Sequence, residues 1–171
     1  MDFPQSQQEW ETLIKGRFDR EPIIAHLKEH EEARKHFLEI ILLRDEFAWR
    51  AAWLLKGAVS AQDNYDDFIE RAIKLIPDLP DGHQREILKL LEIVTINESL
   101  EGPLFDVCMR IWESPGKIPS TRMTAFLFIL ETVKKYPELK TELTHLTQDH
   151  YMESLSPGVK RVLEKRIKKL K

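Results

Sequence analysis

The sequence predicts an all-α protein, and three observations lead to that prediction. Signals that start and stop helices recur along the whole chain, and the apolar residues between them recur at helical spacing. No stretch alternates polar and apolar residues cleanly, as a half-buried strand would. Asp81-Gly82 is the one candidate for a hairpin turn, and helical patterns flank it on both sides.

Helix starts are marked by prolines, whose missing N–H costs nothing in a first turn, and by aspartate or serine, whose oxygen can accept a first-turn N–H. Prolines between the segments are expected to stop helices. Gln84, three residues after Asp81, predicts a capping box. The expected helices, in chain order, are one that opens at Glu21-Pro22, then 46–59 after Asp45, 64–76 after Asp63, 83–94 after Asp81, 104–112 after Gly102-Pro103, 121–135 after Ser120, 138–146 after Pro137 and 158–170 after Ser156-Pro157.

Two of these segments are apolar almost all the way round, 47–59 and 123–130. In the first, Trp49 and Trp53 extend an already broad apolar face, and we expect Trp53 to pack against an adjacent helix. A helix that is apolar on most sides needs neighbours on most sides. Both segments are therefore expected to be central helices.

The composition is typical of one globular domain with a real core: 171 residues, 42% hydrophobic and 32% charged. The net charge of −3 argues against a surface built for nucleic acid. Cys108 is the only cysteine, so no internal disulfide can form and a reducing compartment is favoured. No secretory signal is evident, and the longest nearly apolar run, 123–130, is far shorter than the ~20 residues of a membrane span. We expect a cytoplasmic protein of bacterial type with no membrane segment.

A repeat runs through the chain. Four arginines each lie near the start of an expected helix and precede an aliphatic run: Arg50, Arg85, Arg122 and Arg161, at spacings of 35, 37 and 39 residues. A second amphipathic helix lies between successive arginines, and the first two of these share an apolar stripe at a shift of 36 residues. The matched pairs are Ile69 with Phe105, Ala72 with Cys108, Ile73 with Met109 and Ile76 with Trp112. Helix–turn–helix units of this length predict an α-solenoid.

The segment "FAWRAAWLLKGAV" (47–59) resembles the first helix of a HEAT repeat, in which an arginine precedes small and aliphatic residues. Together with "TRMTAFLFILETVKKYPELKTEL" (121–143) and "VKRVLEKRIKKL" (159–170), it resembles a family of short HEAT-like proteins of Bacteroidetes-type bacteria with no established activity. The resemblance covers about residues 35–171. It implies a right-handed α-α superhelix of about four HEAT-like helix pairs, as a single domain over residues 1–171. Residues 1–34 would form a variant N-terminal cap, and residues 156–171 a basic C-terminal capping helix.

The segment "HLKEH" (26–30) matches H-x-x-E-H, the pattern of the inverted zinc metallopeptidases. On a helix, His26 and His30 would lie on one face and could bind Zn²⁺, with Glu29 as the general base. That enzyme family needs a further, distant glutamate ligand and a much larger α/β fold, and this chain has neither the strands nor the length. We therefore interpret the segment as a polar helix surface.

The other residues that could carry chemistry have plainer structural interpretations. Cys108 lies on an apolar stripe with no histidine near it in the sequence, so we expect a buried thiol rather than a nucleophile. The local signatures of acyl transfer, nucleotide binding and dinucleotide binding are lacking. We predict no catalytic residue, no metal site and no cofactor. A cluster of four carboxylates lies where the dipole of an expected helix favours it: Asp63, Asp66, Asp67 and Glu70.

The last expected helix carries the strongest charge asymmetry. Residues 160–171 hold seven basic side chains and one acid, Glu164, which leaves the rest of the chain at −9. Two interpretations stay open: an end cap that docks its apolar side, and an edge that binds phosphate or an acidic partner. The apolar stripe is Val159, Leu163, Ile167 and Leu170, and the basic residues are Lys160, Arg161, Lys165, Arg166, Lys168, Lys169 and Lys171.

These observations favour a non-enzymatic scaffold that binds another protein or a peptide in a groove lined by the second helices of the units. The side chains off the buried stripes of those helices are of mixed sign, which suits a protein partner better than DNA. The predicted groove residues are Glu70, Arg71, Lys74, Asp106, Arg110 and Glu113.

An alternative from another class is a DNA glycosylase or another nucleic-acid-binding protein. Some alkylpurine DNA glycosylases are HEAT-like solenoids that use aromatic residues and a catalytic aspartate. This chain offers those residue types without a motif that matches residue by residue, and its charge of −9 outside the last helix opposes binding to phosphates. The residues in question are Trp49, Trp53, Trp112 and Asp106.

Overall fold

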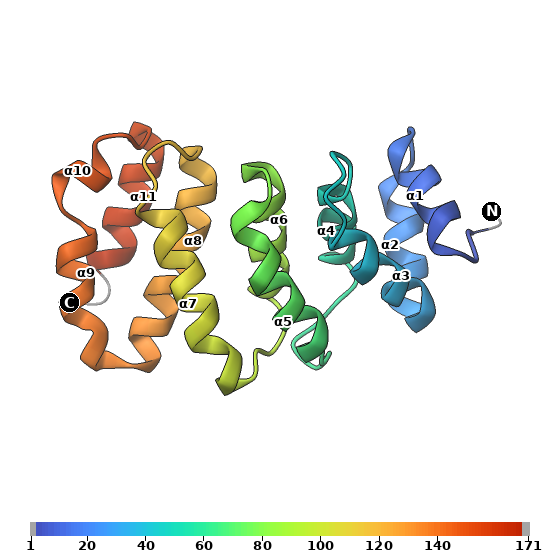
Figure 1. The fold of residues 1–171 in the computed structure, drawn as a ribbon, viewed down its shortest axis with the longest axis horizontal. Coiled ribbons are helices and arrows are strands. Elements are labelled where there is room, and N and C mark those ends of the chain that lie inside the picture. Colours follow the sequence, from blue (N-terminus) through green and yellow to red (C-terminus); the bar gives the residue numbers. More distant parts are fainter. Residues whose placement is uncertain (1–2, 169–171) are drawn as a thin grey trace. The chain divides into compact units, whose positions relative to one another are not determined.

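Every regular element of the computed structural model, which describes residues 3–168, is a helix (Figure 1). Eleven α-helices and two short 3₁₀-helices follow one another, and no strand occurs between residues 3 and 168. The all-α prediction is confirmed, and the succession of short paired helices is that of an α-solenoid. Within the same range, no helix is both long enough and apolar enough to cross a membrane.

The chain divides into two compact units, Met1–Asn97 and Glu98–Lys171. The elements of the first unit are α1 (Gln7–Lys15), α2 (Arg20–Glu29), α3 (Glu31–Ile41), α4 (Trp49–Leu55), α5 (Asp66–Leu75), η1 (Ile76–Asp78) and α6 (Asp81–Leu91). Those of the second unit are α7 (Glu98–Trp112), α8 (Pro119–Lys135), η2 (Pro137–Leu139), α9 (Lys140–Leu146), α10 (Asp149–Met152) and α11 (Pro157–Lys168).

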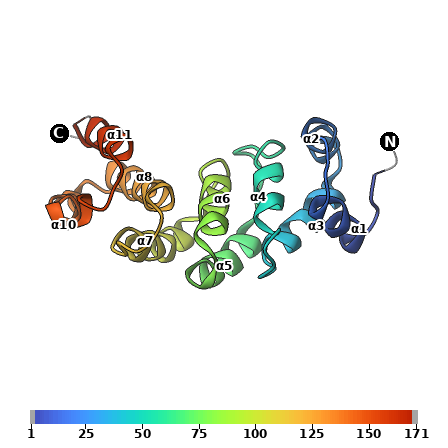
Figure 2. The ribbon, with the colours of Figure 1, turned by 90° about the horizontal axis from the view of Figure 1, so that it is seen from above.

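Helix α4 is the central helix of the first unit. It packs against α2, α3 and α6, and Figure 2 shows α2, α4 and α6 on one side of this unit with α3 and α5 on the other. The prediction of a central helix within 47–59 is confirmed, although the helix is confined to Trp49–Leu55. Gly57, just after α4, faces α2 so closely that a Cβ atom there would lie 2.7 Å from Cδ1 of Ile24. The buried residues of this segment include Ala51, Ala52, Leu54 and Leu55.

Helix α8 has the same role in the second unit, because it packs against both α7 and α11. The rings of Trp112 on α7 and Phe126 on α8 lie 4.2 Å apart, and both side chains are fully buried. The predicted central place of 123–130 is therefore confirmed. Ala125, Ile129 and Leu130 are buried in the same helix.

Several helix starts differ from the prediction, and at two of them a residue has a different role from the one expected. Helix α7 begins at Glu98, before the expected start at Gly102-Pro103, so that Pro103 lies inside the helix. A proline has no N–H to donate, so the helix lacks one bond of its regular ladder at this position. Asp63 does not cap α5 either: its Oδ2 accepts the N–H of Ser60 at 2.7 Å and closes the preceding loop, and Tyr65 occupies the N-cap position.

The predicted capping box at Asp81 and Gln84 is wrong. Pro80 is the N-cap residue of α6, and no side chain caps this helix. Gln84 is fully buried and donates its Nε2–H to the carbonyl of Ile76 at 2.7 Å. Because this side chain is used in tertiary packing, it does not form the capping bond that the local sequence pattern predicted. A true capping box joins Ser6 and Glu9 at the start of α1, which the sequence analysis did not single out.

Arginines bind the carbonyl ends of neighbouring helices. The last carbonyls of a helix have no partner within it, and a guanidinium offers five N–H donors. Arg50 of α4 donates to the carbonyls of Ile14 and Gly16 at 2.8 and 3.2 Å, at the end of α1. Arg122 of α8 donates to the carbonyl of Trp112 at 2.9 Å, at the end of α7, and to that of Tyr151 at 2.7 Å. The repeated arginine therefore has a structural role in both units.

Hydrogen bonds within each unit join residues about one repeat apart. Thr95 donates its hydroxyl to the carbonyl of Ala61, 34 residues away. The indole N–H of Trp112 reaches the carbonyl of Leu146, also 34 residues away. With the bond from Arg50 to Ile14, at a separation of 36, these contacts reproduce the repeat length read from the sequence.

The burial of the tryptophans differs from what we expected from the apolar character of residues 47–59. Trp10 and Trp112 are fully buried, whereas the side chain of Trp49 is 36% exposed and Trp53 is half-buried beneath the guanidinium of Arg20, 4.7 Å from its ring. Trp53 therefore packs in part against the guanidinium of Arg20. The helix is not closed to solvent on the side that carries these two residues.

Trp112→Ala is expected to destabilise the protein strongly, because it empties a fully buried site and leaves the carbonyl of Leu146 without its donor. The expected loss is about 3–5 kcal/mol in the free energy of unfolding, measured by chemical denaturation. Trp49→Ala is the matched control, and its exposed ring should cost no more than about 0.5 kcal/mol. Equal midpoints for the two variants would contradict the assignment of Trp112 to the core.

Arg122→Lys is expected to lower the free energy of unfolding by about 1–3 kcal/mol, because an ammonium cannot satisfy three acceptors arranged for a planar fork. The acceptors are the carbonyls of Trp112 and Tyr151 and the hydroxyl of Ser154. Burial lowers the pKa of Arg122, since it removes the guanidinium from water, and these acceptors take the place of that water. Arg161→Lys changes the exposed counterpart in the repeat, and its denaturation midpoint should stay at the wild-type value.

His83 makes stability depend on pH. Burial lowers its pKa below the usual 6.5, although the bond of its Nε2 to the carbonyl of Ile41 acts in the opposite direction. The unfolded chain therefore binds a proton more readily than the folded protein. The stability that neutral His83 contributes is fully present above the usual pKa and is lost as the pH falls through the lower pKa of the folded state.

In urea denaturation, the wild-type midpoint should fall between about pH 7.5 and about pH 5.5. His83→Gln retains an N–H donor for Ile41 but does not titrate, so its midpoint should fall less. The rest of the fall is assigned to His26, whose pKa burial also lowers. An identical fall in both proteins would rule out His83 as the source.

Candidate functional site

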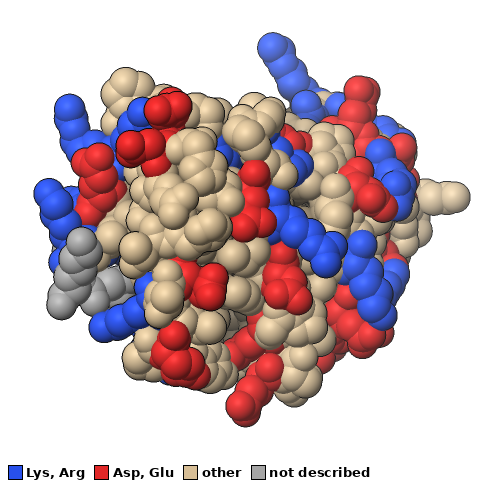
Figure 3. Space-filling view, turned by 60° about the vertical axis from the view of Figure 1, so that its left-hand side comes forward, with Lys and Arg blue, Asp and Glu red and all other residues tan. Residues whose placement is uncertain are grey.

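The six residues predicted to line a groove are all exposed. Glu70, Arg71 and Lys74 lie on α5 in the first unit, and Asp106 and Arg110 lie on α7 in the second, with Glu113 directly after it. Each set of three therefore belongs to one compact unit and is described with that unit. On the face drawn in Figure 3, lysine and arginine are interspersed with aspartate and glutamate, and neither sign dominates.

On α5, the side chains are held by ion pairs. Arg71 binds Glu39 of α3 through both terminal nitrogens, at 2.7 Å each, and also approaches Asp67 at 3.4 Å. The hydrogen bonds to Glu39 raise the pKa of Arg71, and the bonds from Arg71 lower that of Glu39. Lys74 bonds Glu70 at 2.6 Å, which lowers the pKa of Glu70. This surface is pre-ordered, and its two cations face three carboxylates, so it carries a slight excess of negative charge.

On α7, Asp106 lies at the edge of a hollow of about 540 Å³ within the second unit. The hollow is formed by the first half of α7, the end of α8 and η2. Its lining combines apolar and acidic groups, and the acids Glu98 and Asp106 have no hydrogen bond or ion pair with another described residue. The lining residues are Glu98, Glu101, Gly102, Pro103, Phe105, Asp106, Thr132, Tyr136 and Leu139.

Glu101 is the best-ordered acid of this hollow. It accepts bonds from Lys135 at 2.6 Å and from the hydroxyl of Tyr136 at 2.8 Å. The bond from Lys135 is the main cause that lowers the pKa of Glu101, and the same carboxylate raises the pKa of Tyr136. We did not predict this contact from the sequence, although its separation of 35 residues equals the repeat length and could have indicated it.

The two histidines of "HLKEH" stack on each other. Helix α2 ends at Glu29, so His30 lies outside it, between α2 and α3, and the two rings lie 3.8 Å apart. The ring of Phe3 stacks on that of His26 at 4.0 Å, and Nδ1 of His30 lies 2.9 Å from the carbonyl of His26. The helix surface expected here is in part an aromatic stack. Among residues 3–168, no three His, Cys, Asp or Glu side chains are grouped closely enough to hold a metal ion.

Cys108 is fully buried on α7, as predicted. Asp66 and Asp67 lie in the first turn of α5, where the dipole was expected to favour them. In α11, Leu163 is buried while most of the basic side chains are exposed, and the helix packs against α8. Lys169, Leu170 and Lys171, which belong to the predicted basic helix and its stripe, lie outside the described residues.

One of the aromatic residues on which the glycosylase alternative depends is inaccessible. Trp112 is fully buried, and its indole N–H bonds the carbonyl of Leu146, so its ring is not available to stack on a base. Asp106 is exposed at the edge of the hollow, and no shielded position of a catalytic aspartate is formed around it. The alternative is therefore not favoured.

Comparison with known families identifies the family to which the chain belongs. Residues 14–170 match a family described as a HEAT repeat domain. No curated protein and no solved structure matches the chain, so the narrower resemblance to short proteins of Bacteroidetes-type bacteria has no support. The match, the all-helical fold and the contacts at one repeat length agree: the chain belongs to the HEAT repeat domain family.

Proposed function

We propose that the protein is a non-enzymatic scaffold that binds another protein or a peptide through exposed side chains of its repeat helices. The observation that carries the proposal is the match to a HEAT repeat domain over residues 14–170. Repeats of this kind stack into extended surfaces, and such surfaces commonly serve protein interactions. The proposed setting is the cytoplasm, and no cofactor is part of the proposal.

The charge pattern of the repeat helices supports a protein partner. The α5 and α7 positions carry both signs, and complementary charges of mixed sign set the register and specificity of a protein–protein contact. On α5, the bidentate Arg71–Glu39 pair pre-orders the surface, so less side-chain entropy is lost on binding. In the second unit, the apolar side chains of Phe105 and Leu139 supply a place for an anchoring side chain.

Charge reversal on α5 and α7 tests this proposal. The protein is immobilised, partners are captured from a lysate of its native host and identified, and the purified partner is then titrated against each variant. Lys74→Glu/Arg110→Glu is expected to weaken binding by about tenfold or more, because both side chains are exposed on the helices proposed to bind the partner, one in each unit.

The matched control is Lys28→Glu/Lys134→Glu, which makes the same charge change on α2 and α8. Lys134 pairs with Glu131 on its own helix as Lys74 pairs with Glu70, so both double variants lose one exposed ion pair. Equal affinity of the groove variant and the control would exclude these helices as the binding surface. Failure of the wild-type protein to bind any partner saturably, or excision of alkylated bases by it, would contradict the scaffold function itself.

A further inference from the structure

The hollow on α7 in the second unit has walls that are largely apolar. Phe105 and Leu139 line it, Tyr136 adds its ring, and Gly102 and Pro103 leave it free of long side chains. Its volume of about 540 Å³ lies within the range of pockets that hold small ligands, ~300–1,000 Å³. The hollow therefore has room for one large side chain of a partner and part of the backbone that carries it.

The polar side chains that line this hollow present hydrogen-bond acceptors. The carboxylates of Glu98, Glu101 and Asp106 can only accept bonds when they are ionised. The hydroxyl of Tyr136 donates its hydrogen to Glu101 at 2.8 Å, and that of Thr132 donates to a carbonyl of its own helix at 3.0 Å. Each polar side chain of the lining thus offers lone pairs to an occupant, and none has a hydrogen left to donate.

The charge of the hollow is negative. Three carboxylates and no cation are among its lining residues, and only Glu101 is balanced, by the bond from Lys135 at 2.6 Å. The side chains of Glu98 and Asp106 are exposed and bond no other residue between 3 and 168. The helix dipole favours Glu98 and Glu101 in the first turn of α7, but Asp106 lies beyond its reach. The dipole therefore does not account for all of the acids.

Lys135 provides an internal example of a cation held at this place. Its Nζ lies 5.2 Å from the centre of the Tyr136 ring while it bonds Glu101, so a ring and a carboxylate bind one cation together. Phe105 and Asp106 bring a second ring and a second carboxylate to the same hollow. Within the described part of the chain, no cation and no other ring lies against Phe105. The second combination is therefore open to a cation from outside the chain.

We propose that this hollow is the docking site for an arginine side chain of a partner protein. The proposal rests on the proposed scaffold function and specifies the chemistry of the partner's anchoring side chain. Arginine has five N–H donors and no acceptor, which complements a lining of acceptors. Its guanidinium can stack on the ring of Phe105 while it bonds a carboxylate, and its aliphatic stem suits the apolar walls. Lysine lacks the planar group, so it is the weaker occupant.

The test is a titration of the whole chain with fluorescein-labelled peptides, followed by fluorescence anisotropy at physiological salt, where long-range attraction is screened. One peptide carries arginines separated by glycine and serine. The second carries citrulline at the same positions, which has nearly the shape of arginine without its charge, and the third carries lysine. The arginine peptide is expected to bind at least about tenfold more tightly than the citrulline peptide and about threefold more tightly than the lysine peptide.

Glu98→Gln/Asp106→Asn keeps the size of both side chains and removes their charges, so it is expected to weaken binding of the arginine peptide by about tenfold or more. Glu142→Gln/Asp149→Asn is the matched control. It makes the same change in two exposed acids of the same unit that do not line the hollow, and it should change the affinity by less than about twofold. Phe105→Leu keeps an apolar wall without the ring and should weaken binding of the arginine peptide about threefold.

Circular dichroism checks that each variant folds. If Glu98→Gln/Asp106→Asn does not fold, Asp106→Asn alone replaces it and should weaken binding of the arginine peptide about threefold or more. Equal losses in the two double variants would overturn the proposal, as would a citrulline or lysine peptide that binds as tightly as the arginine peptide. Sedimentation that finds the chain bound to itself, and separated by the change at Glu98 and Asp106, would also overturn it and would make a second copy the occupant.

The scaffold function is judged separately with the partner captured from lysate. If that partner binds the wild-type protein and Glu98→Gln/Asp106→Asn equally well, the docking site falls and the scaffold function stands. If no partner binds saturably, the scaffold function fails whatever the peptides do.

Discussion

Each unit of this protein depends on one helix that is apolar on most of its sides. Helix α4 packs against three other helices and α8 packs against two, and these contacts bury the small and aliphatic side chains that neither helix could shield alone. In a repeat fold, a helix pair can cover its apolar stripe only against neighbouring pairs. The other features of each unit, including the arginine bonds at helix ends, act around that packing.

The arginine bonds solve the polar side of the same problem. A helix that ends against a neighbour cannot leave its last carbonyls to water, and a guanidinium from the next helix can satisfy several of them at once. Arg50 does so for the end of α1, Arg122 for the end of α7, and Arg34, on α3, donates to the carbonyls of Leu27 and Lys28 near the end of α2. These arginines lie on the central helices or on a helix next to one. The same helix contacts therefore bury the apolar side chains and provide hydrogen-bond donors for the carbonyls.

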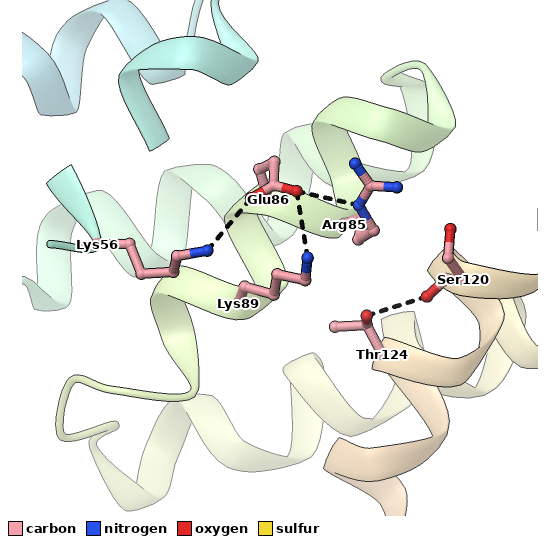
Figure 4. Close-up of polar contacts among 6 residues, drawn as sticks. All are labelled: Lys56, Arg85, Glu86, Lys89, Ser120 and Thr124. Carbon is pink, nitrogen blue, oxygen red and sulfur yellow. Dashed lines mark hydrogen bonds and ion pairs between the residues drawn. The ribbon is translucent and has the colours of Figure 1, made fainter. Parts of the chain in front are cut away.

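The charged surface of the first unit is organised in two different ways. On α5, each cation is matched by one or two carboxylates, which gives an ordered face with a slight excess of negative charge. Around α6, the buried carboxylate of Glu86 is shared by Arg85 and Lys89 of the same helix and by Lys56, just after α4 (Figure 4). The α5 arrangement is of the kind that sets the register of a contact with a protein partner.

The sequence by itself determined the helical class, the repeat length and the central helices, because helical periodicity and composition are local properties that packing did not reverse. It also indicated the repeated arginine, although the bonds of Arg50 and Arg122 to distant carbonyls could not be read from their spacing alone. Only the tertiary structure decided the fate of individual side chains. Gln84, which a local motif assigned to a cap, is buried against Ile76, and Trp112 rather than Trp53 is fully enclosed. The Glu86 cluster also arises only when α4 and α6 pack together. Its contact between Lys56 and Glu86 joins residues 30 positions apart, and no local pattern spans that distance.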